Sequence, residues 1–268
     1  MMSQLMWVAV DGYNIAKRNL IKIKRVPEIL IWVLMSPIMF VLLFAYVFGG
    51  AIDVPGVNYK EFLIAGIFAQ TVVFGATYTG AGLAEDMKKG IIDRFRSLPM
   101  TRSAVMIGRT GSDIIYNVLS ITIMALTGLL VGWQIRTSFW EAAAGFGLLL
   151  LFSYALSWVM ATIGLMMPSP EVVNNASFMV IMPLTFVSNA FVPMESLPGP
   201  LRVFAEWNPV SAVTQGARNL FGNVNPLATP SEAWSMQNPE LYTLIWIGVI
   251  LFIFVPYSIR LYKRVAKK

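Results

Sequence analysis

Six stretches of this chain are dominated by apolar residues, and shorter polar or charged segments separate them. They cover residues 29–48, 62–83, 104–132, 140–167, 172–192 and 241–257. Each has close to the ~20 residues that one helix needs to cross the hydrocarbon core of a bilayer. The pattern predicts an all-α polytopic membrane protein with six transmembrane helices. We expect a single domain over residues 1–268, because neither a linker nor a repeat divides the chain.

The segment before the first span, residues 1–27, has a helical pattern of its own. One side of the helix would carry the apolar residues Leu5, Ala9, Tyr13, Ala16, Leu20 and Ile23. The opposite side would carry the charged residues Asp11, Arg18, Lys22 and Arg25. This division predicts an amphipathic helix lying in the membrane interface. The alternative is a basic flank that only anchors the first span, and it predicts the same orientation.

The basic residues predict how the spans are oriented. Of the 20 Lys and Arg residues, sixteen precede the first span, fall between the second and third spans, or follow the sixth. Basic residues gather on the cytoplasmic side of membrane proteins, and an even number of spans places both termini on one side. We therefore expect a multi-pass protein of the inner cell membrane with cytoplasmic N- and C-termini.

Composition argues against several classes of function. Hydrophobic residues make up 57% of the chain and charged residues 13%, whereas soluble domains average ~25% charged. Cysteine and histidine are absent, and the remaining reactive residue types do not cluster, so we expect no catalytic residues, metal or cofactor. No Gly is followed directly by Lys, which excludes a GxxxxGK[ST] phosphate loop. The net charge of +6 is better explained by basic residues that orient the spans and contact anionic lipid head groups than by binding of nucleic acid.

The cytoplasmic segment 84–99, between the second and third spans, is also amphipathic. Apolar residues recur at spacings of three and four, at Ala84, Met87, Ile91, Phe95 and Leu98. Charged residues of both signs lie between or after them, at Glu85, Asp86, Lys89, Asp93, Arg94, Arg96 and Arg102. We expect one short helix with its apolar side on the membrane domain and its charges turned outward. Its acids would repel an anionic leaflet, which favours a docking surface for a protein partner, and a solvated connector is the alternative.

The extracytoplasmic segment 193–240 contains the second informative pattern. Prolines at 198, 200 and 209 predict the starts of two short helices, over residues 201–207 and from 209 to about 221. Neither is long enough to span a bilayer. We interpret them as interfacial helices that cover the outer ends of the spans. An ordinary packed outer loop is the alternative.

Together these two segments carry a family resemblance, in the stretches EDMKKGIIDRFRSLPMTRSAVMIGR and FVPMESLPGPLRVFAEWNPVSAVTQGAR. They resemble permease subunits of the type-2 ATP-binding-cassette (ABC) exporters, particularly the daunorubicin-resistance branch that moves drugs and lipids. The resemblance covers the full chain. Polysaccharide exporters share this architecture and are an alternative.

The resemblance implies several partners. It implies that residues 85–98 form a coupling helix in a cleft of a separate ATPase subunit, which binds ATP and Mg²⁺. The helix before Lys24 and the turn at residues 167–171 would make further contacts with the ATPase. It also implies a second permease copy or a related permease in the same bilayer, and export of an amphipathic substrate.

Polar residues within the second and fifth spans are candidates for the translocation path: Gln70, Thr71, Thr77, Tyr78, Asn174, Asn175, Ser188 and Asn189. Hydrogen bonds between buried helices are the alternative explanation. An ion-coupled secondary multidrug transporter usually needs ionisable groups near the middle of the bilayer. Arg109 and Asp113 lie only in the first turns of the third span, so this function is disfavoured.

Overall fold

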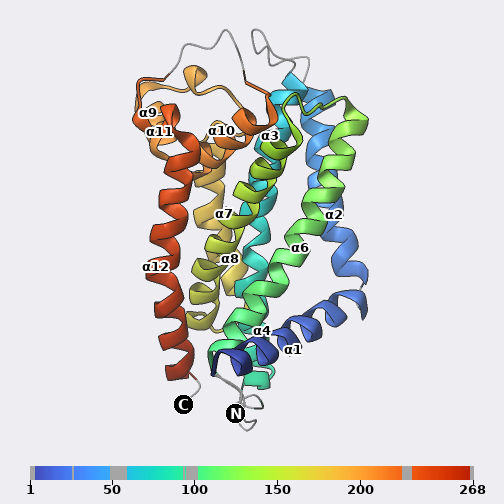
Figure 1. The fold of residues 1–268 in the computed structure, drawn as a ribbon, viewed down its shortest axis with the longest axis vertical. Helices are drawn as coiled ribbons and strands as arrows, with labels where there is room; N and C mark the ends of the chain where they lie inside the picture. Colours follow the sequence, from blue (N-terminus) through green and yellow to red (C-terminus); the bar gives the residue numbers. More distant parts are fainter. Residues whose placement is uncertain are drawn as a thin grey trace.

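Helices make up nearly all of the computed structural model, which describes residues 4–25, 27–48, 59–92, 94, 102–224 and 231–265. These residues contain no strand, so the all-α class is confirmed. In Figure 1 the long helices stand side by side, and both chain termini lie at one end of the bundle together with α1 (Gln4–Arg25). The opposite end carries three short helices: α9 (Gly199–Trp207), α10 (Pro209–Phe221) and α11 (Trp234–Gln237).

Four of the described helices are long and apolar enough to cross a bilayer. They are α3 (Tyr59–Gly75) joined to α4 (Thr77–Lys88), α6 (Arg102–Val131), α7 (Phe139–Met166) and α12 (Pro239–Val265). The other two expected spans fall on α2 and α8. The first, α2 (Pro27–Leu42), has 16 residues and continues as the π-helical turn η1 (Leu43–Phe48); the second, α8 (Pro170–Phe186), has 17. The count of six spans therefore stays a prediction.

The fifth expected span, 172–192, is longer than the helix that forms there. Helix α8 ends at Phe186, and the chain turns at Ser188 and Asn189 before the short 3₁₀ turn η2 (Met194–Ser196). The Asn208 side chain helps to end the helix, because its Nδ2 donates to the carbonyl oxygens of Leu184 at 2.6 Å and of Val187 at 2.8 Å. A side chain 21 to 24 residues further along thus satisfies carbonyls that the helix end leaves free.

The single helix expected over residues 84–99 is interrupted. Ala84 to Lys88 form the last turn of α4, which belongs to the second span, and Gly90 follows with a φ of 64°. That backbone conformation suits glycine and ends an α-helix. Asp93 and residues 95–101 lie outside the described residues, so Phe95, Arg96 and Leu98 have no position here.

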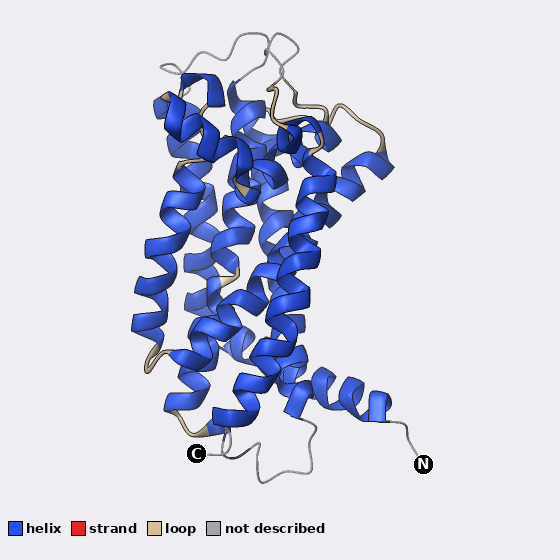
Figure 2. Cartoon of the chain, turned by 90° about the vertical axis from the view of Figure 1, so that its left-hand side faces the viewer, coloured by secondary structure: helices blue, strands red, loops and turns tan. Residues whose placement is uncertain are grey.

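Helix α1 lies across the end of the bundle and projects to one side (Figure 2). Its contact face includes Asp11, Ile15 and Asn19, which are buried, whereas Tyr13 is 66% exposed. The helix packs against α6, where a Cβ added at Gly108 would overlap the Gly12 carbonyl oxygen. Asp11, from the side expected to be charged, is therefore turned toward the protein, and the side with Tyr13 remains available to lipid.

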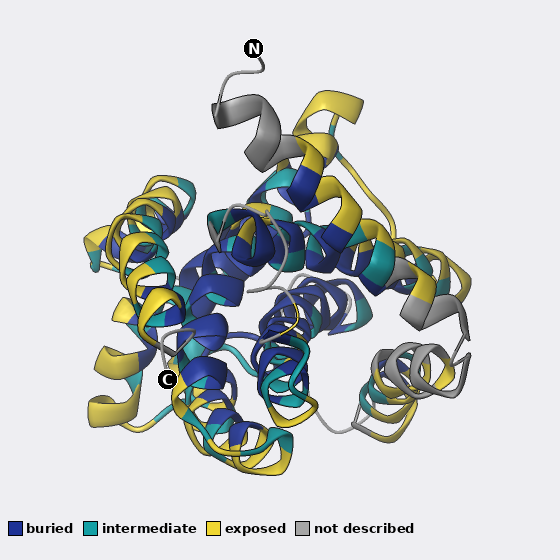
Figure 3. Cartoon of the chain, turned by 90° about the horizontal axis from the view of Figure 1, so that it is seen from below, coloured by how far each residue is buried: buried dark blue, intermediate teal, exposed yellow. Residues whose placement is uncertain are grey.

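Buried residues line the inner faces of the bundle, and exposed residues cover its outer faces (Figure 3). Large apolar side chains are among the exposed ones, including Leu130 at 88%, Phe252 at 84% and Met179 at 79%. Outer faces of this kind suit a hydrocarbon surrounding, where apolar exposure has no cost.

The end of the bundle opposite the termini, called the outer end from here on, is closely packed around an aromatic cluster. The rings of Phe68, Trp133, Phe146 and Phe221 lie with centroids between 4.8 and 5.9 Å apart in their contacting pairs. Helix α10, which supplies Phe221, begins at Pro209 behind the Asn208 N-cap and ends at Gly222 with a φ of 73°. The two short helices expected from the proline positions are present as α9 and α10. Whether these helices lie at a membrane surface depends on the topology proposed below.

Candidate functional site

A cavity of about 390 Å³ lies among α2, α3, α4, α6 and α8. Much of its wall consists of the apolar side chains Phe40, Phe74, Phe178 and Met182. Phe74 of α3 and Phe178 of α8 meet edge to face, with ring centroids 6.4 Å apart. Cavities of ~300–1,000 Å³ with predominantly apolar walls are typical sites for drug-sized ligands.

A few polar groups interrupt this apolar wall. The Gln70 and Ser120 side chains are buried, and Oε1 of Gln70 and Oγ of Ser120 have no hydrogen-bond partner in the described part of the chain. Buried polar atoms usually have partners, so these two are available to a ligand. The hydroxyls of Thr71 and Thr77, in contrast, donate to carbonyl oxygens three or four residues earlier.

The structure divides the predicted path residues into three groups. Gln70, Thr71, Thr77 and Tyr78 all line the apolar cavity. Ser188 and Asn189 lie buried in the outer turn, where the Ser188 Oγ donates to a backbone carbonyl and the Asn189 Nδ2 donates to Gln215. Asn174 and Asn175 are exposed on α8. The cavity thus brings together the four candidates from the second span and none from the fifth.

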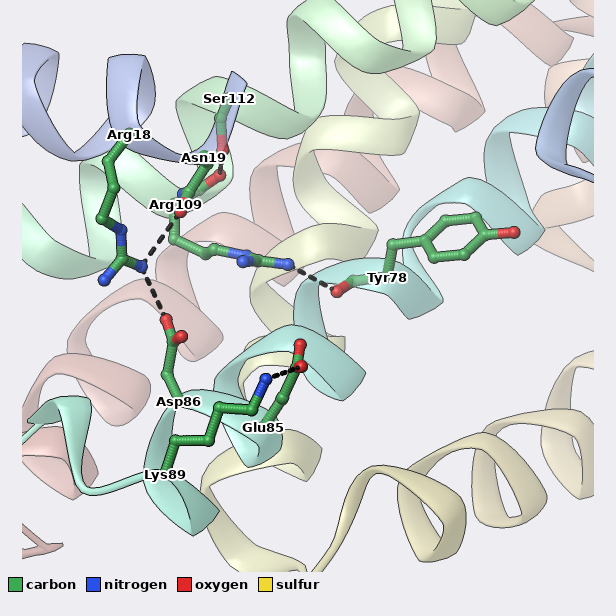
Figure 4. Close-up of polar contacts among 8 residues, drawn as sticks. All are labelled: Arg18, Asn19, Tyr78, Glu85, Asp86, Lys89, Arg109 and Ser112. Carbon is green, nitrogen blue, oxygen red and sulfur yellow. Dashed lines mark hydrogen bonds and ion pairs between the residues drawn. The ribbon is translucent and has the colours of Figure 1, made fainter. Parts of the chain in front are cut away.

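The charged residues near the end of α4 do not all face outward (Figure 4). Asp86 is 6% exposed, and its Oδ2 accepts a hydrogen bond from Nη2 of Arg18 on α1 at 2.8 Å. Arg18 also donates to Asn19, whose Nδ2 donates to Ser112 of α6 at 3.1 Å. The expectation that Asp86 is an outward docking residue is therefore wrong, because its carboxylate ties α1 to α4.

Other members of that segment are nearer the surface. Nζ of Lys89 donates to the Glu85 carboxylate at 2.6 Å, and this hydrogen bond with the carboxylate charge raises the pKa of Lys89. Arg94 is exposed. Of the expected apolar side, Ala84 is buried, Met87 packs against the core and Ile91 is half-buried. The side chain of Arg102 lies outside the described set, although its backbone begins α6.

A row of polar residues on α6 faces α4, and the sequence analysis did not assign these residues to a site. The row consists of Arg109, Ser112, Asp113, Tyr116 and Ser120, at spacings of three and four. The Asp113 carboxylate is buried and accepts a hydrogen bond from the Thr79 hydroxyl. A polar face along an otherwise apolar span is the signal that could have found these residues.

This row includes a cationic group held in a defined position. Nη2 of Arg109 donates to the carbonyl oxygen of Tyr78 at 2.8 Å, across from α6 to α4 (Figure 4). The guanidinium lies directly on Gly82, because a Cβ added there would overlap it. Among the described residues that line the apolar cavity, no nucleophile lies beside a base.

Comparison with known proteins places the chain in a family. A sequence model described as "ABC-2 type transporter" matches residues 13–221. The daunorubicin resistance ABC transporter permease protein DrrB1 of Streptomyces coeruleorubidus is 31% identical over 247 residues, which cover 92% of this chain and 84% of that protein. The extent of both matches confirms the resemblance inferred from the two segments.

Two further relatives are more distant. The putative transport permease ycf38 of Pyropia yezoensis is 25% identical over 78% of this chain and 72% of its own length. The probable doxorubicin resistance ABC transporter permease protein DrrC of Mycobacterium tuberculosis is 23% identical over 59% of this chain and 56% of its own. The chain therefore belongs to the ABC-2 type transporter family, whose members are membrane permease subunits of ABC transporters.

Proposed function

We propose that this chain is the membrane-spanning subunit of an exporter that moves amphipathic drugs or lipids out of the cytoplasm or the inner leaflet. A separate ATPase subunit, which binds ATP and Mg²⁺, supplies the energy. The observation that carries the proposal is the cavity of about 390 Å³, whose apolar wall contains two buried polar atoms without partners. The resistance functions in the names of DrrB1 and DrrC support drug-like cargo.

The proposed topology places the end with both termini in the cytoplasm. That end carries α1 and the end of α12, and it is where the basic residues are concentrated. The short helices α9 to α11 then lie at the outer surface of the inner membrane. Cytoplasmic basic residues are the usual determinant of this orientation.

The proposal includes a second permease chain, either another copy or a related protein. Helices α2 and α8 both border the cavity, and each turns large apolar side chains outward. On α2 these are Ile31, Met35 and Met39, and on α8 they are Phe178, Met179 and Val180. A second chain packed against these faces would close the cavity, and a path would then run between the two chains.

The ATPase would dock at the surface formed by Glu85, Lys89 and Arg94, extended by Asp93, Arg96 and Arg102. Asp86 is removed from this set because it binds Arg18. Reversing the charges of Glu85 and Asp93 together should weaken pull-down of the ATPase while leaving membrane insertion intact. Asp86→Asn is the matched comparison, since it changes an acid in the same segment that faces α1. Unchanged ATPase binding in the double reversal would make this segment a connector only.

Transport is tested by reconstituting the purified chain into liposomes with and without its ATPase. We expect export of an anthracycline only when the ATPase and ATP are both present. Robust transport by the chain alone, driven by a proton or sodium gradient, would contradict the proposal and favour a secondary transporter.

The role of the cavity is tested with Gln70→Trp, which fills it with a bulky ring. We expect transport to fall strongly while ATPase binding persists, because the substitution lies far from the docking surface. Thr122→Trp, on an exposed position of α6, is the matched control. Equal transport by both variants would show that the cavity is not on the path.

A further inference from the structure

A second cavity, of about 290 Å³, lies below the apolar one at the proposed cytoplasmic end. Its walls come from α1, α4, α6 and the start of α8. Much of its surface is apolar, but the residues around it include ionisable and hydrogen-bonding groups: Asn19, Glu85, Arg109, Ser112 and Asp113. None of these residues was expected to bind cargo.

The charges around this cavity are not equally compensated. The Glu85 carboxylate is paired with Lys89 at 2.6 Å, and the Asp113 carboxylate accepts a hydrogen bond from Thr79. Arg109 donates to a neutral partner, the Tyr78 carbonyl; it forms no ion pair within the described residues, although its charge acts on the Asp113 carboxylate one turn away. Its buried Nε has no hydrogen-bond partner there. The group best able to accept a charged ligand is therefore the guanidinium.

The guanidinium is also positioned for this task. It rests on the backbone at Gly82, where any larger residue would displace it. A planar guanidinium offers parallel N–H donors that match the oxygen pair of a carboxylate or phosphate. Such a fork, held against a helix, recognises an anion with less loss of side-chain freedom than a mobile surface lysine.

The two cavities are neighbours that share part of their walls. Tyr78 and Tyr116 line both, and their rings meet edge to face with centroids 5.4 Å apart. Above this pair lies the apolar wall of Phe40, Phe74 and Phe178, and below it lies Arg109. Both spaces are mainly apolar, and the second one also borders the cationic Arg109, a combination that suits an amphiphile with an anionic head group.

We propose that these cavities bind a lipid-like amphiphile through a phosphodiester head group at Arg109, with its hydrocarbon chain passing the tyrosine pair into the apolar cavity. Glu85 lies one turn nearer the cytoplasm than Gly82, and Asp113 lies one turn deeper than Arg109. These carboxylates disfavour head groups with more than one negative charge. This inference rests on the proposed function in one respect: it takes the bound amphiphile to be the substrate that the exporter moves.

The test is native mass spectrometry of the purified full chain without ATPase or ATP. The probes are phosphatidylglycerol, phosphatidylethanolamine, diacylglycerol of the same chain length, and soluble glycerol 3-phosphate. We expect both phospholipids to bind, and Arg109→Gln to weaken their binding roughly tenfold or more, as expected for loss of charged hydrogen bonds. Diacylglycerol and glycerol 3-phosphate should each bind far more weakly, since the first lacks the phosphate that Arg109 would bind and the second lacks the hydrocarbon chains.

Two variants separate this site from general charge effects. Lys88→Gln removes an exposed basic residue at the same end of the protein and should leave lipid binding unchanged. Gly82→Ala keeps the charge of Arg109 but moves the guanidinium, and it should weaken binding as Arg109→Gln does. Wild-type binding by Arg109→Gln, or equal losses in Arg109→Gln and Lys88→Gln, would overturn the proposal. So would diacylglycerol or glycerol 3-phosphate binding as tightly as the phospholipids.

Transport by the reconstituted complex distinguishes this inference from the proposed function. If Arg109→Gln no longer binds lipid but still exports drug, the phospholipid is not the transported substrate, and the proposed ATP-driven export of drugs stands. Intact lipid binding by a wild-type complex that transports nothing would overturn the proposed function and leave the binding site.

Discussion

Two arginines, one near each end of the bundle, show how similar groups take different roles. Arg218 at the outer end is 1% exposed and donates hydrogen bonds to the carbonyl oxygens of Phe62, Asn189 and Ala190, at 2.7 to 3.2 Å. Its guanidinium also lies over the Phe62 ring, 3.5 Å from the centroid. Arg109, at the end with both termini, has one backbone carbonyl partner and borders a cavity.

The difference follows from what surrounds each guanidinium. At the outer end the turn after α8 presses against α3, and a Cβ added at Gly66 would overlap the Ala190 carbonyl oxygen. Three backbone carbonyls therefore converge on Arg218 and leave little room for a ligand. At the end with both termini, α1 crosses the bundle instead of filling it. Each arginine has one buried nitrogen without a partner within the described residues, Nη1 of Arg218 and Nε of Arg109, but only Arg109 borders a cavity.

The strongest test of this contrast is Arg218→Leu. Removing the guanidinium leaves buried carbonyl oxygens without partners, so we expect a loss on the order of 3 kcal/mol in the free energy of unfolding. Thermal unfolding of the detergent-solubilised protein, followed by tryptophan fluorescence, measures it. Arg109→Leu should cost much less in the same assay, because one carbonyl loses one bond. Equal losses would remove the distinction between the two arginines.

A second test compares close contacts at the two ends. Gly66→Ala places a methyl group against the backbone of Ala190, which cannot move aside as a side chain would, and we expect a cost of about 2 kcal/mol. Gly12→Ala on α1 should be nearly neutral, because its nearest neighbours lie at 3.7 Å. The yield of monodisperse protein and its unfolding temperature report both. A well-folded Gly66→Ala protein with unchanged unfolding temperature would contradict the predicted contact.

A third test concerns the attachment of α1. Asp86→Asn removes the carboxylate that holds Arg18, and we expect local stability to fall by about 1 kcal/mol, a typical value for a part-buried ion pair. Hydrogen–deuterium exchange in the peptide around Asn19 should accelerate roughly fivefold, the factor that corresponds to 1 kcal/mol. Lys89→Gln breaks an exposed pair on the same helix and should not alter that exchange. Unchanged exchange in Asp86→Asn would show that helix packing alone holds α1.

The smallest effect is expected at the pair of Arg202 and Glu206 on α9, whose side chains are 42% and 14% exposed. These side chains are four residues apart, with Nε of Arg202 3.1 Å from Oε1 of Glu206. Pairs of this kind contribute about 0.3–0.5 kcal/mol, so Arg202→Gln should barely shift the unfolding temperature. The variant also serves as the control for Arg218→Leu, since both remove an arginine from the outer end. A loss as large as that of Arg218→Leu would mean that α9 is integral to the outer packing.

The sequence by itself determined the helical class, the positions of the long apolar helices, the two short outer helices and the family. These follow from local rules: apolar runs of the right length form helices in lipid, and prolines mark helix starts. The same patterns led to Gln70, Thr71, Thr77 and Tyr78, which line the apolar cavity.

Only the tertiary structure decided which polar side chains face one another. The pattern around Asp86 suggested an exposed acid, but its partner Arg18 lies 68 residues away on a helix that crosses the bundle. Asn189 was a candidate for the path, yet it is hydrogen-bonded to Ser211 and Gln215 of helix α10. The roles of Arg218 and Arg109 were likewise decided by which backbone carbonyls approach each guanidinium. Such approaches depend on how helices pack, and residue spacing along one helix carries no information about its distant neighbours.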